Sequence, residues 1–199
     1  MKFDMSAVIL TMGDRPKALK ESINSIRNQE KINVEIIIVW NGLVPDYSVD
    51  AEKHVHSSVN IGIPAGRNLG ASNTNEKIIL FLDDDAQLTS NDLLYKVKQT
   101  FNADDSIAIA SLRIIDEDGL TARRHVPRLG SKSKAISGEA TSFLGGASVA
   151  RKFAWDQVDG YSGDLFYSME ETDLSWRILN AGWKIFTSWN FTFFSSKFC

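Results

Sequence analysis

The sequence predicts an α/β fold in which helices cover both faces of a mainly parallel β-sheet. Short apolar runs of strand length alternate along the chain with segments whose apolar residues recur at helical spacing. The run at 34–40 is β-branched almost throughout and has no polar face, as expected of a strand that is buried on both sides. Regular alternation of strand and helix is typical of a doubly wound sheet.

The first half of the chain is expected to supply four strands and two helices. A helix should begin near Pro16, because proline is favoured in the first helical turn, and Leu19, Ile23 and Ile26 then follow at helical spacing. The expected elements are a strand at 7–11, the helix from Pro16, a buried parallel strand at 34–40, a short strand near 54–57, a helix beginning within 60–70, and a strand at 78–82.

The second half is expected to continue the alternation after one long interruption. From 114 to 138 the chain is polar and basic, which predicts a long loop that carries Arg123 and Arg124. This loop could close over a diphosphate or receive an anionic acceptor, or it could simply be solvated. The expected elements are a helix containing 93–101, a strand at 107–112, a strand at 141–150 around its glycine pair, a helix at 173–181 closed by Gly182, and an aromatic-rich strand at 185–194.

Composition narrows the class of protein. The 199 residues are 43% apolar, enough for one continuous core, and the formal charge of −3 gives no reason to expect nucleic acid as a partner. Cys199 is the one cysteine, which rules out an intrachain disulfide and suits a reducing compartment. No stretch has the length of a transmembrane helix. We therefore expect a cytoplasmic protein, with peripheral contact at the inner face of a membrane left open.

Three adjacent aspartates, Asp83, Asp84 and Asp85, end the apolar run at 78–82. Alternation along an extended backbone predicts Asp83 and Asp85 on one side and Asp84 on the other, so two carboxylates could converge on a hard cation. Adjacent carboxylates repel one another by roughly 1 kcal/mol per close pair in water, and a cation would remove that cost. The alternative is a solvated acidic turn that caps the next helix.

Residues 60–70 form a glycine-rich segment that matches neither the P-loop nor the dinucleotide-binding fingerprint. Arg67, beside an expected helix N-terminus, could bind a diphosphate. The alternative is that Gly62, Gly66 and Gly70 allow a helix to pack closely on the sheet.

A second acidic group, Glu170, Glu171 and Asp173, lies at the start of an expected helix. Acidic residues in the first turn interact favourably with the helix dipole, which explains them without any catalytic role. One of the two glutamates could instead act as a general base.

The order and spacing of four segments, taken together, resemble glycosyltransferase family 2, whose members are inverting enzymes with a GT-A fold. The resemblance covers nearly the whole chain. The segments are Val8-Ile-Leu-Thr11 with Arg15-Pro16, Asn60-x-Gly62 with Ala65-Gly-Arg67-Asn68-x-Gly70, Ile79 to Ala86 with the three aspartates, and Phe166-Tyr-x-x-Glu-Glu-x-Asp-Leu-Ser-Trp-Arg177.

This resemblance implies a single Rossmann-like GT-A domain over 1–199, with a nucleotide-binding half at 1–112 and an acceptor and catalytic half at 113–199. It implies transfer of a sugar from a nucleoside-diphosphate sugar to a hydroxyl of a glycan, polysaccharide or lipid-linked acceptor, with Mn²⁺ or Mg²⁺ as cofactor. The implied nucleotide-sugar-binding residues are Thr11, Arg15, Asn41, Arg67, Asp83, Asp84, Gly145 and Gly146; the implied metal ligands are Asp83 and Asp85; the implied catalytic residues are Glu170, Glu171 and Asp173. Most of the aromatic residues are expected in the core, and only Trp155 or Tyr161 is expected near the acceptor.

The chain departs from the family pattern at three places. Trp40-Asn41-Gly42 stands where many members have a base-reading aspartate, Glu170-Glu171 replaces a Glu-Asp pair, and 194–197 lacks a late metal-binding histidine. These departures leave open the nucleotide, the identity of the base and the strength of metal binding. Two alternatives remain, a catalytically degenerate domain that binds a nucleotide or a partner, and a sugar nucleotidyltransferase.

Overall fold

One mixed β-sheet forms the centre of the molecule. The computed structural model describes residues 2–42, 45–115, 119–121 and 137–195. The strands lie in the order β3-β2-β1-β4-β8-β6-β9-β5, and β7 pairs with β9. Their bounds are β1 Met5–Thr11, β2 Val34–Asn41, β3 Lys53–Ser57, β4 Ile78–Asp83, β5 Ala86–Leu88, β6 Ile107–Ile115, β7 Gly138–Ala140, β8 Ala147–Arg151 and β9 Lys184–Ser195. Strands β3, β2, β1 and β4 are parallel, β6 is parallel to β9, and β8 runs antiparallel between β4 and β6.

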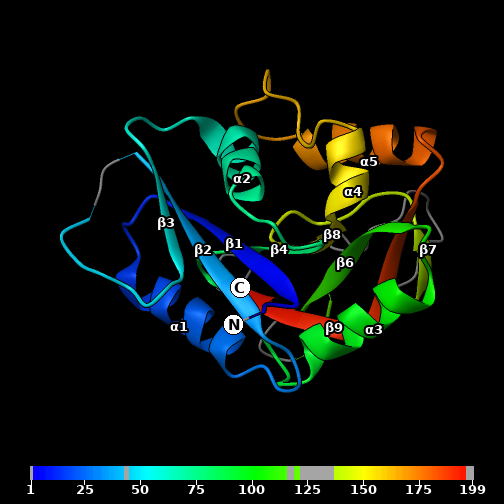
Figure 1. Ribbon diagram of the computed structural model, residues 1–199, viewed down its shortest axis with the longest axis horizontal. Coiled ribbons are helices and arrows are strands. Elements are labelled where there is room, and N and C mark those ends of the chain that lie inside the picture. The colour runs from blue at the N-terminus through cyan, green and yellow to red at the C-terminus, as the bar shows by residue number, and fades with distance from the viewer. Residues whose placement is uncertain (1, 43–44, 116–118, 122–136, 196–199) are drawn as a thin grey trace.

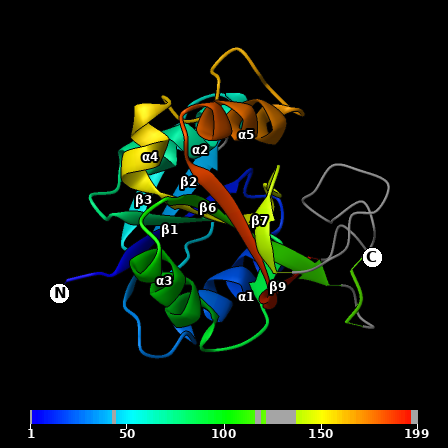
Figure 2. The same ribbon diagram turned by 90° about the vertical axis from the view of Figure 1, so that its right-hand side faces the viewer.

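Helices cover both faces of this sheet, which confirms the predicted α/β fold. Figures 1 and 2 show α2, α4 and α5 on one face and α1 and α3 on the other. Their bounds are α1 Pro16–Arg27, α2 Gly62–Ser72, α3 Leu93–Ala103, α4 Lys152–Gln157 and α5 Glu170–Asn180. None of the helices in the described part of the chain is both long enough and apolar enough to cross a bilayer.

The central parallel strand β2 contributes apolar side chains to two hydrophobic cores, one on each face of the sheet. In β2, Ile36 and Ile38 pack in the core beneath α1 and α3, whereas Ile37 and Val39 pack in the core beneath α2 and α5. Successive side chains of a strand point to opposite faces, so a strand covered on both faces favours apolar residues at successive positions. This is why the run at 34–40 lacks hydrophobic alternation. The one charged residue of this run, Glu35, is buried but paired with Lys53 at 2.8 Å and hydrogen-bonded by Ser6.

The glycines of α2 bring that helix close to the sheet. A Cβ atom added to Gly66 would clash with the Leu10 side chain, and one added to Gly70 would clash with Val8. The packing interpretation of these two glycines is therefore confirmed. It also fixes how near the polar residues of α2 lie to the ends of β1 and β4.

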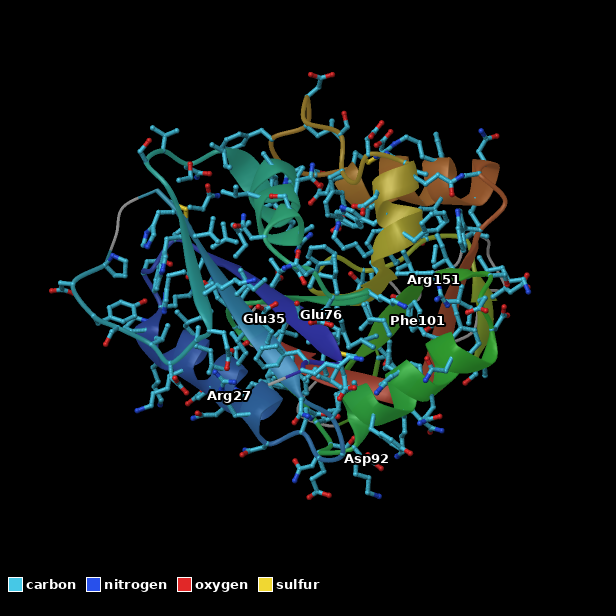
Figure 3. All side chains as sticks on the ribbon, in the orientation of Figure 1. Arg27, Glu35, Glu76, Asp92, Phe101 and Arg151 are labelled. Carbon is cyan, nitrogen blue, oxygen red and sulfur yellow. The ribbon has the colours of Figure 1, made fainter. Side chains whose placement is uncertain are left out.

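Arg151 lies at the end of β8, opposite Ile78 at the start of β4, and its side chain links β6 to the end of α3. Its Nε donates to the Ile107 carbonyl at 2.9 Å, and its Nη2 donates to the Phe101 carbonyl at 2.8 Å. Figure 3 labels Arg151 and Phe101 beside each other at the end of α3. The three aspartates lie at the opposite end of β4.

Several predicted boundaries were wrong. The strand expected at 141–150 begins only at Ala147, because Gly145 and Gly146 lie in the turn before it, and the helix expected at 173–181 begins at Glu170. Helix α4 and the short strands β5 and β7 were not predicted, since three to six residues carry little periodic signal. Most of the predicted basic loop, including Arg123 and Arg124, lies outside the described residues.

Candidate active site

The carboxyl ends of three parallel strands meet beside a pocket. Strand register places Leu10 opposite Asp83 and Thr11 opposite Trp40, so Thr11, Asn41 and Asp83 lie at the same edge of the sheet. Ligands bind at this edge in open α/β sheets. The pocket has a volume of about 270 Å³ and is lined by Leu10, Thr11, Met12, Arg15, Asn41, Asn60, Gly62, Ile63, Arg67, Asp83, Asp84, Phe166 and Tyr167.

Arg67 is a buried cation at the base of the pocket. Its Nη2 donates to Asp83 Oδ1 at 2.9 Å, and its Nη1 lies 3.9 Å from Glu171 Oε1. Its Nη1 also donates to the Tyr161 hydroxyl at 3.4 Å. Burial alone would lower the pKa of Arg67, but the surrounding Tyr161, Asp83 and Glu171 outweigh burial and raise it. The guanidinium is therefore a fixed positive charge shared between two carboxylates.

Gly145 and Gly146 let these charged groups approach one another. A Cβ atom on Gly145 would lie 2.6 Å from Arg67 Nη1 and closer still to Glu171 Oε1. A Cβ atom on Gly146 would lie 3.2 Å from Asp83 Oδ2, and the Gly146 carbonyl accepts a hydrogen bond from Asp83 N at 2.9 Å. The turn before β8 thus leaves free the space in which Arg67, Asp83 and Glu171 converge.

The structure distinguishes Glu170 from Glu171. Glu171 is 27% exposed and lies beside Arg67, whereas Glu170 is 3% exposed and its Oε2 has no hydrogen-bond partner within the described part of the chain. Burial raises the pKa of Glu171, the charge of Glu170 raises it further, and Arg67 lowers it in part. A carboxyl group with a raised pKa at a partly open position suits a general base.

The three aspartates divide between two arginines. Asp83 pairs with Arg67, whereas Arg15 contacts Asp84 Oδ1 through Nη2 at 2.6 Å and Asp85 Oδ2 through Nη1 at 2.5 Å. Thr11 Oγ1 also donates to Asp84 Oδ2 at 2.7 Å. The strand alternation from which Asp83 and Asp85 were expected on one side does not extend to Asp85. Strand β4 ends at Asp83, and Asp84 and Asp85 form the turn into β5, where the strand alternation no longer applies.

Carboxylate oxygens are present that suit a hard cation. Asp83 lines the pocket, and its Oδ2 faces the open side of Gly146, whereas Asp85 lies behind Arg15. Among the described residues, no group of three or more side chains forms a complete metal site. Mg²⁺ and similar ions often take only one or two carboxylates, with substrate phosphates as further ligands. The residues therefore fit a cation that binds together with a diphosphate, provided that Arg15 moves. The late segment at 196–197, predicted to lack a metal-binding histidine, lies outside the described residues.

Asn41 lines the pocket, but its side-chain amide is hydrogen-bonded to two backbone groups and to the Asn60 side chain. Its Oδ1 accepts from Ile61 N at 2.9 Å, and its Nδ2 donates to Gly62 O at 3.3 Å and to Asn60 Oδ1 at 3.0 Å. Backbone N–H groups only donate and carbonyls only accept, so these partners fix the orientation of the amide. Asn41 therefore holds the loop that leads into α2.

The pocket lining does not include Asp85, Gly145, Gly146, Glu170 or Glu171, nor three further predicted residues. Asp173 is paired with Arg177 on its own helix, with its Oδ2 2.6 Å from Arg177 Nη2. Trp155 and Tyr161 were expected near the acceptor, but both are buried in the core beneath α4 and α5, where Trp155 stacks on Phe81. Tyr161 contributes from behind, through its hydroxyl contact with Arg67.

The pocket rim contains residues to which the sequence assigned no role. The Phe166 carbonyl accepts from Ile63 N at 3.0 Å and lies so near Gly62 that a Cβ atom there would be 2.5 Å from it. Phe166 and Tyr167 are largely exposed. Both belong to the motif that also contains Glu171, and this proximity in sequence was the only available signal.

The arrangement agrees with a match to a known family. The family model described as "Glycosyl transferase family 2" matches residues 6–158, well over half of the chain. The chain belongs to glycosyl transferase family 2. No curated protein matches the sequence.

Solved structures of glycosyltransferases share the fold of this family 2 chain at low sequence identity. GalNAc-T7, crystallised with UDP, GalNAc and Mn²⁺, is 16% identical with a TM-score of 0.73, over 97% of this chain and 44% of that one. The mannosyltransferase PcManGT from Pyrobaculum calidifontis, in complex with GDP-Man and Mn²⁺, is 16% identical with a TM-score of 0.72, over 98% and 57%. S. aureus TarS 1–349 in complex with UDP is 16% identical with a TM-score of 0.69, over 96% and 60%. The chain therefore spans about half the length of these proteins, and the likeness establishes a GT-A-like fold.

Proposed function

We propose that this chain transfers a sugar from a nucleoside-diphosphate sugar to an acceptor hydroxyl, with inversion at the anomeric carbon. The observation that carries the proposal is the convergence of Arg67, Asp83 and Glu171 around the Gly145-Gly146 turn, beside a pocket at the carboxyl ends of the parallel strands. A fixed cation near the leaving group and a carboxylate base near the acceptor are the two groups that a single displacement requires.

Each residue has a separate task in this proposal. The donor's diphosphate lies in the pocket near Arg15 and Arg67, whose guanidinium groups suit phosphate oxygens. Glu171 removes the proton of the acceptor hydroxyl while its oxygen bonds to the anomeric carbon. The bond from that carbon to the diphosphate breaks, and the nucleoside diphosphate leaves with the electron pair. Arg67 stabilises the charge that develops on it.

Asp83 and Asp85 would hold a divalent cation, Mn²⁺ or Mg²⁺, which supplies further positive charge for the leaving diphosphate. Two of the solved structures that share this fold were crystallised with Mn²⁺. For the acceptor we propose a carbohydrate or a lipid-linked sugar. A cytoplasmic location, with peripheral contact at the inner face of a membrane, stays a prediction.

Thermal-shift measurements with UDP, GDP, dTDP and CDP, each with and without Mn²⁺, would identify the nucleotide, because a ligand that binds only the native state raises its stability. Release of the matching nucleoside diphosphate from its sugar conjugates then measures turnover. Glu171→Gln should lower kcat by at least about 100-fold, in the range that general-base catalysis contributes, whereas Glu170→Gln should retain turnover. Nucleotide binding without turnover on any donor would instead support the degenerate domain.

A further inference from the structure

The Arg15 guanidinium lies beside the turn formed by Asp84 and Asp85, called the acidic turn below, where a bound metal ion would otherwise balance their charge. Its two terminal nitrogens contact different aspartates, Nη2 to Asp84 at 2.6 Å and Nη1 to Asp85 at 2.5 Å. The side chains of these aspartates are only 3% and 1% exposed, whereas that of Arg15 is 33% exposed. A metal ion from solvent therefore reaches Asp85 only after the guanidinium has moved.

The position of Arg15 also gives it a second partner. Arg15 lines the donor pocket together with Thr11 and Asp84, so an anion in the pocket lies within its reach. It is the residue immediately before α1, and its side chain is partly open to solvent. A guanidinium binds a phosphate in the same forked geometry that it uses for carboxylates. A diphosphate can thus replace the carboxylates as the partner of Arg15.

We propose that Arg15 is an internal counter-cation that keeps Asp85 closed to divalent metal until a nucleoside diphosphate enters the pocket. This inference rests on the proposed function, since it concerns the same donor site. The diphosphate draws the guanidinium away from the acidic turn and at the same time supplies further oxygen ligands. Nucleotide and metal therefore bind together, and neither Asp84 nor Asp85 is left as an uncompensated buried charge in the empty protein.

Two measurable consequences follow. Mn²⁺ binds weakly to the protein alone and much more tightly when a nucleoside diphosphate is present, and by linkage the metal strengthens nucleotide binding by the same factor. Coupling between two sites is typically about 5- to 150-fold. Without Arg15, Mn²⁺ should bind about tenfold more tightly to the protein alone, and the coupling should largely vanish.

The test is a titration with Mn²⁺, in which electron paramagnetic resonance measures the free ion, with and without UDP or GDP. Wild type is compared with Arg15→Gln and with the matched control Arg27→Gln. Arg27 lies at the other end of α1 (Figure 3) and is 31% exposed, and it pairs with Glu52 at 2.7 Å and with Asp50 at 3.6 Å rather than with Asp84 or Asp85. Only the Arg15 variant should gain metal affinity, and adding Asp85→Asn should abolish that gain.

Other outcomes overturn the inference. The inference is refuted if wild type and Arg15→Gln bind Mn²⁺ with equal affinity in the absence of nucleotide. It is also refuted if the nucleotide strengthens Mn²⁺ binding in Arg15→Gln as much as it does in wild type. If Arg15→Gln fails to fold, Arg15→Lys, which cannot form the fork, should shift affinity in the same direction. Failure of Mn²⁺ to bind any variant under any condition would refute both the counter-cation and the metal assignment, whereas sugar transfer itself is judged separately by turnover of Glu171→Gln.

Discussion

A single methyl group added at Gly145 should disrupt the active site while leaving the fold in place. In Gly145→Ala the new Cβ would lie 2.6 Å from Arg67 Nη1 and closer still to Glu171 Oε1, although ordinary contacts begin near 3.4 Å. Gly145 does not have a positive φ, so alanine fits its backbone. The strain therefore falls on the two charged side chains, which must move apart.

The size of the effect follows from that displacement. The Glu171 carboxylate and the Arg67 guanidinium must each retreat by about 1 Å to restore normal contacts, and a misplacement of that size costs on the order of 100-fold in rate. This corresponds to about 2.7 kcal/mol in the barrier. Because most of the pocket wall is untouched, nucleotide affinity should change far less than kcat.

The assay is release of nucleoside diphosphate during sugar transfer, with kcat and KM measured for Gly145→Ala, Gly163→Ala and wild type. Gly163 is the matched control, since a Cβ atom there meets nothing within 4 Å. The control should behave as wild type, and both variants should melt within a few degrees of it. If Gly145→Ala kept kcat within threefold of wild type, the convergence of Arg67 and Glu171 would not be catalytic.

Three further predictions concern pH and stability. Burial and the charge of Glu170 raise the pKa of Glu171, and Glu171 must be ionised to act as a base. The acidic limb of the plot of kcat against pH should therefore lie above the pKa of an ordinary glutamate. Glu170→Gln should move this limb to lower pH. Gly70→Ala forces a methyl group against Val8 and should lower the free energy of unfolding in urea by about 1–3 kcal/mol. Trp155→Ala should lower it by about 3–5 kcal/mol, and a loss below 1 kcal/mol would contradict its core position.

Two tryptophans, Trp155 and Trp176, differ in exposure in a way that their local sequence does not predict. Trp155 is buried on Phe81, whereas Trp176 is 62% exposed on α5. Trp155 follows Phe153-Ala154 and Trp176 follows Leu174-Ser175, in each case a large apolar residue and then a small one, so local composition could not separate a core ring from a surface ring. The contact that decides between them is made with β4, distant in the chain.

The sequence by itself determined the elements that have a strong local cause. The run at 34–40 had to be a strand buried on both faces, Pro16 marked the start of α1, and the aspartates had to end β4 at the edge where ligands bind. The spacing of four motifs was enough to indicate the family. These signals are local, because propensity and periodicity act between neighbouring residues.

Only the tertiary structure decided which charged groups meet. It paired Asp83 with Arg67 and Asp85 with Arg15, and it placed Glu171 rather than Glu170 beside the pocket. These pairings join residues up to about a hundred positions apart, and they depend on how α1, α2 and α5 pack on the sheet. A charged side chain carries no signal in its own sequence for a distant partner, since Coulomb attraction depends on separation in space.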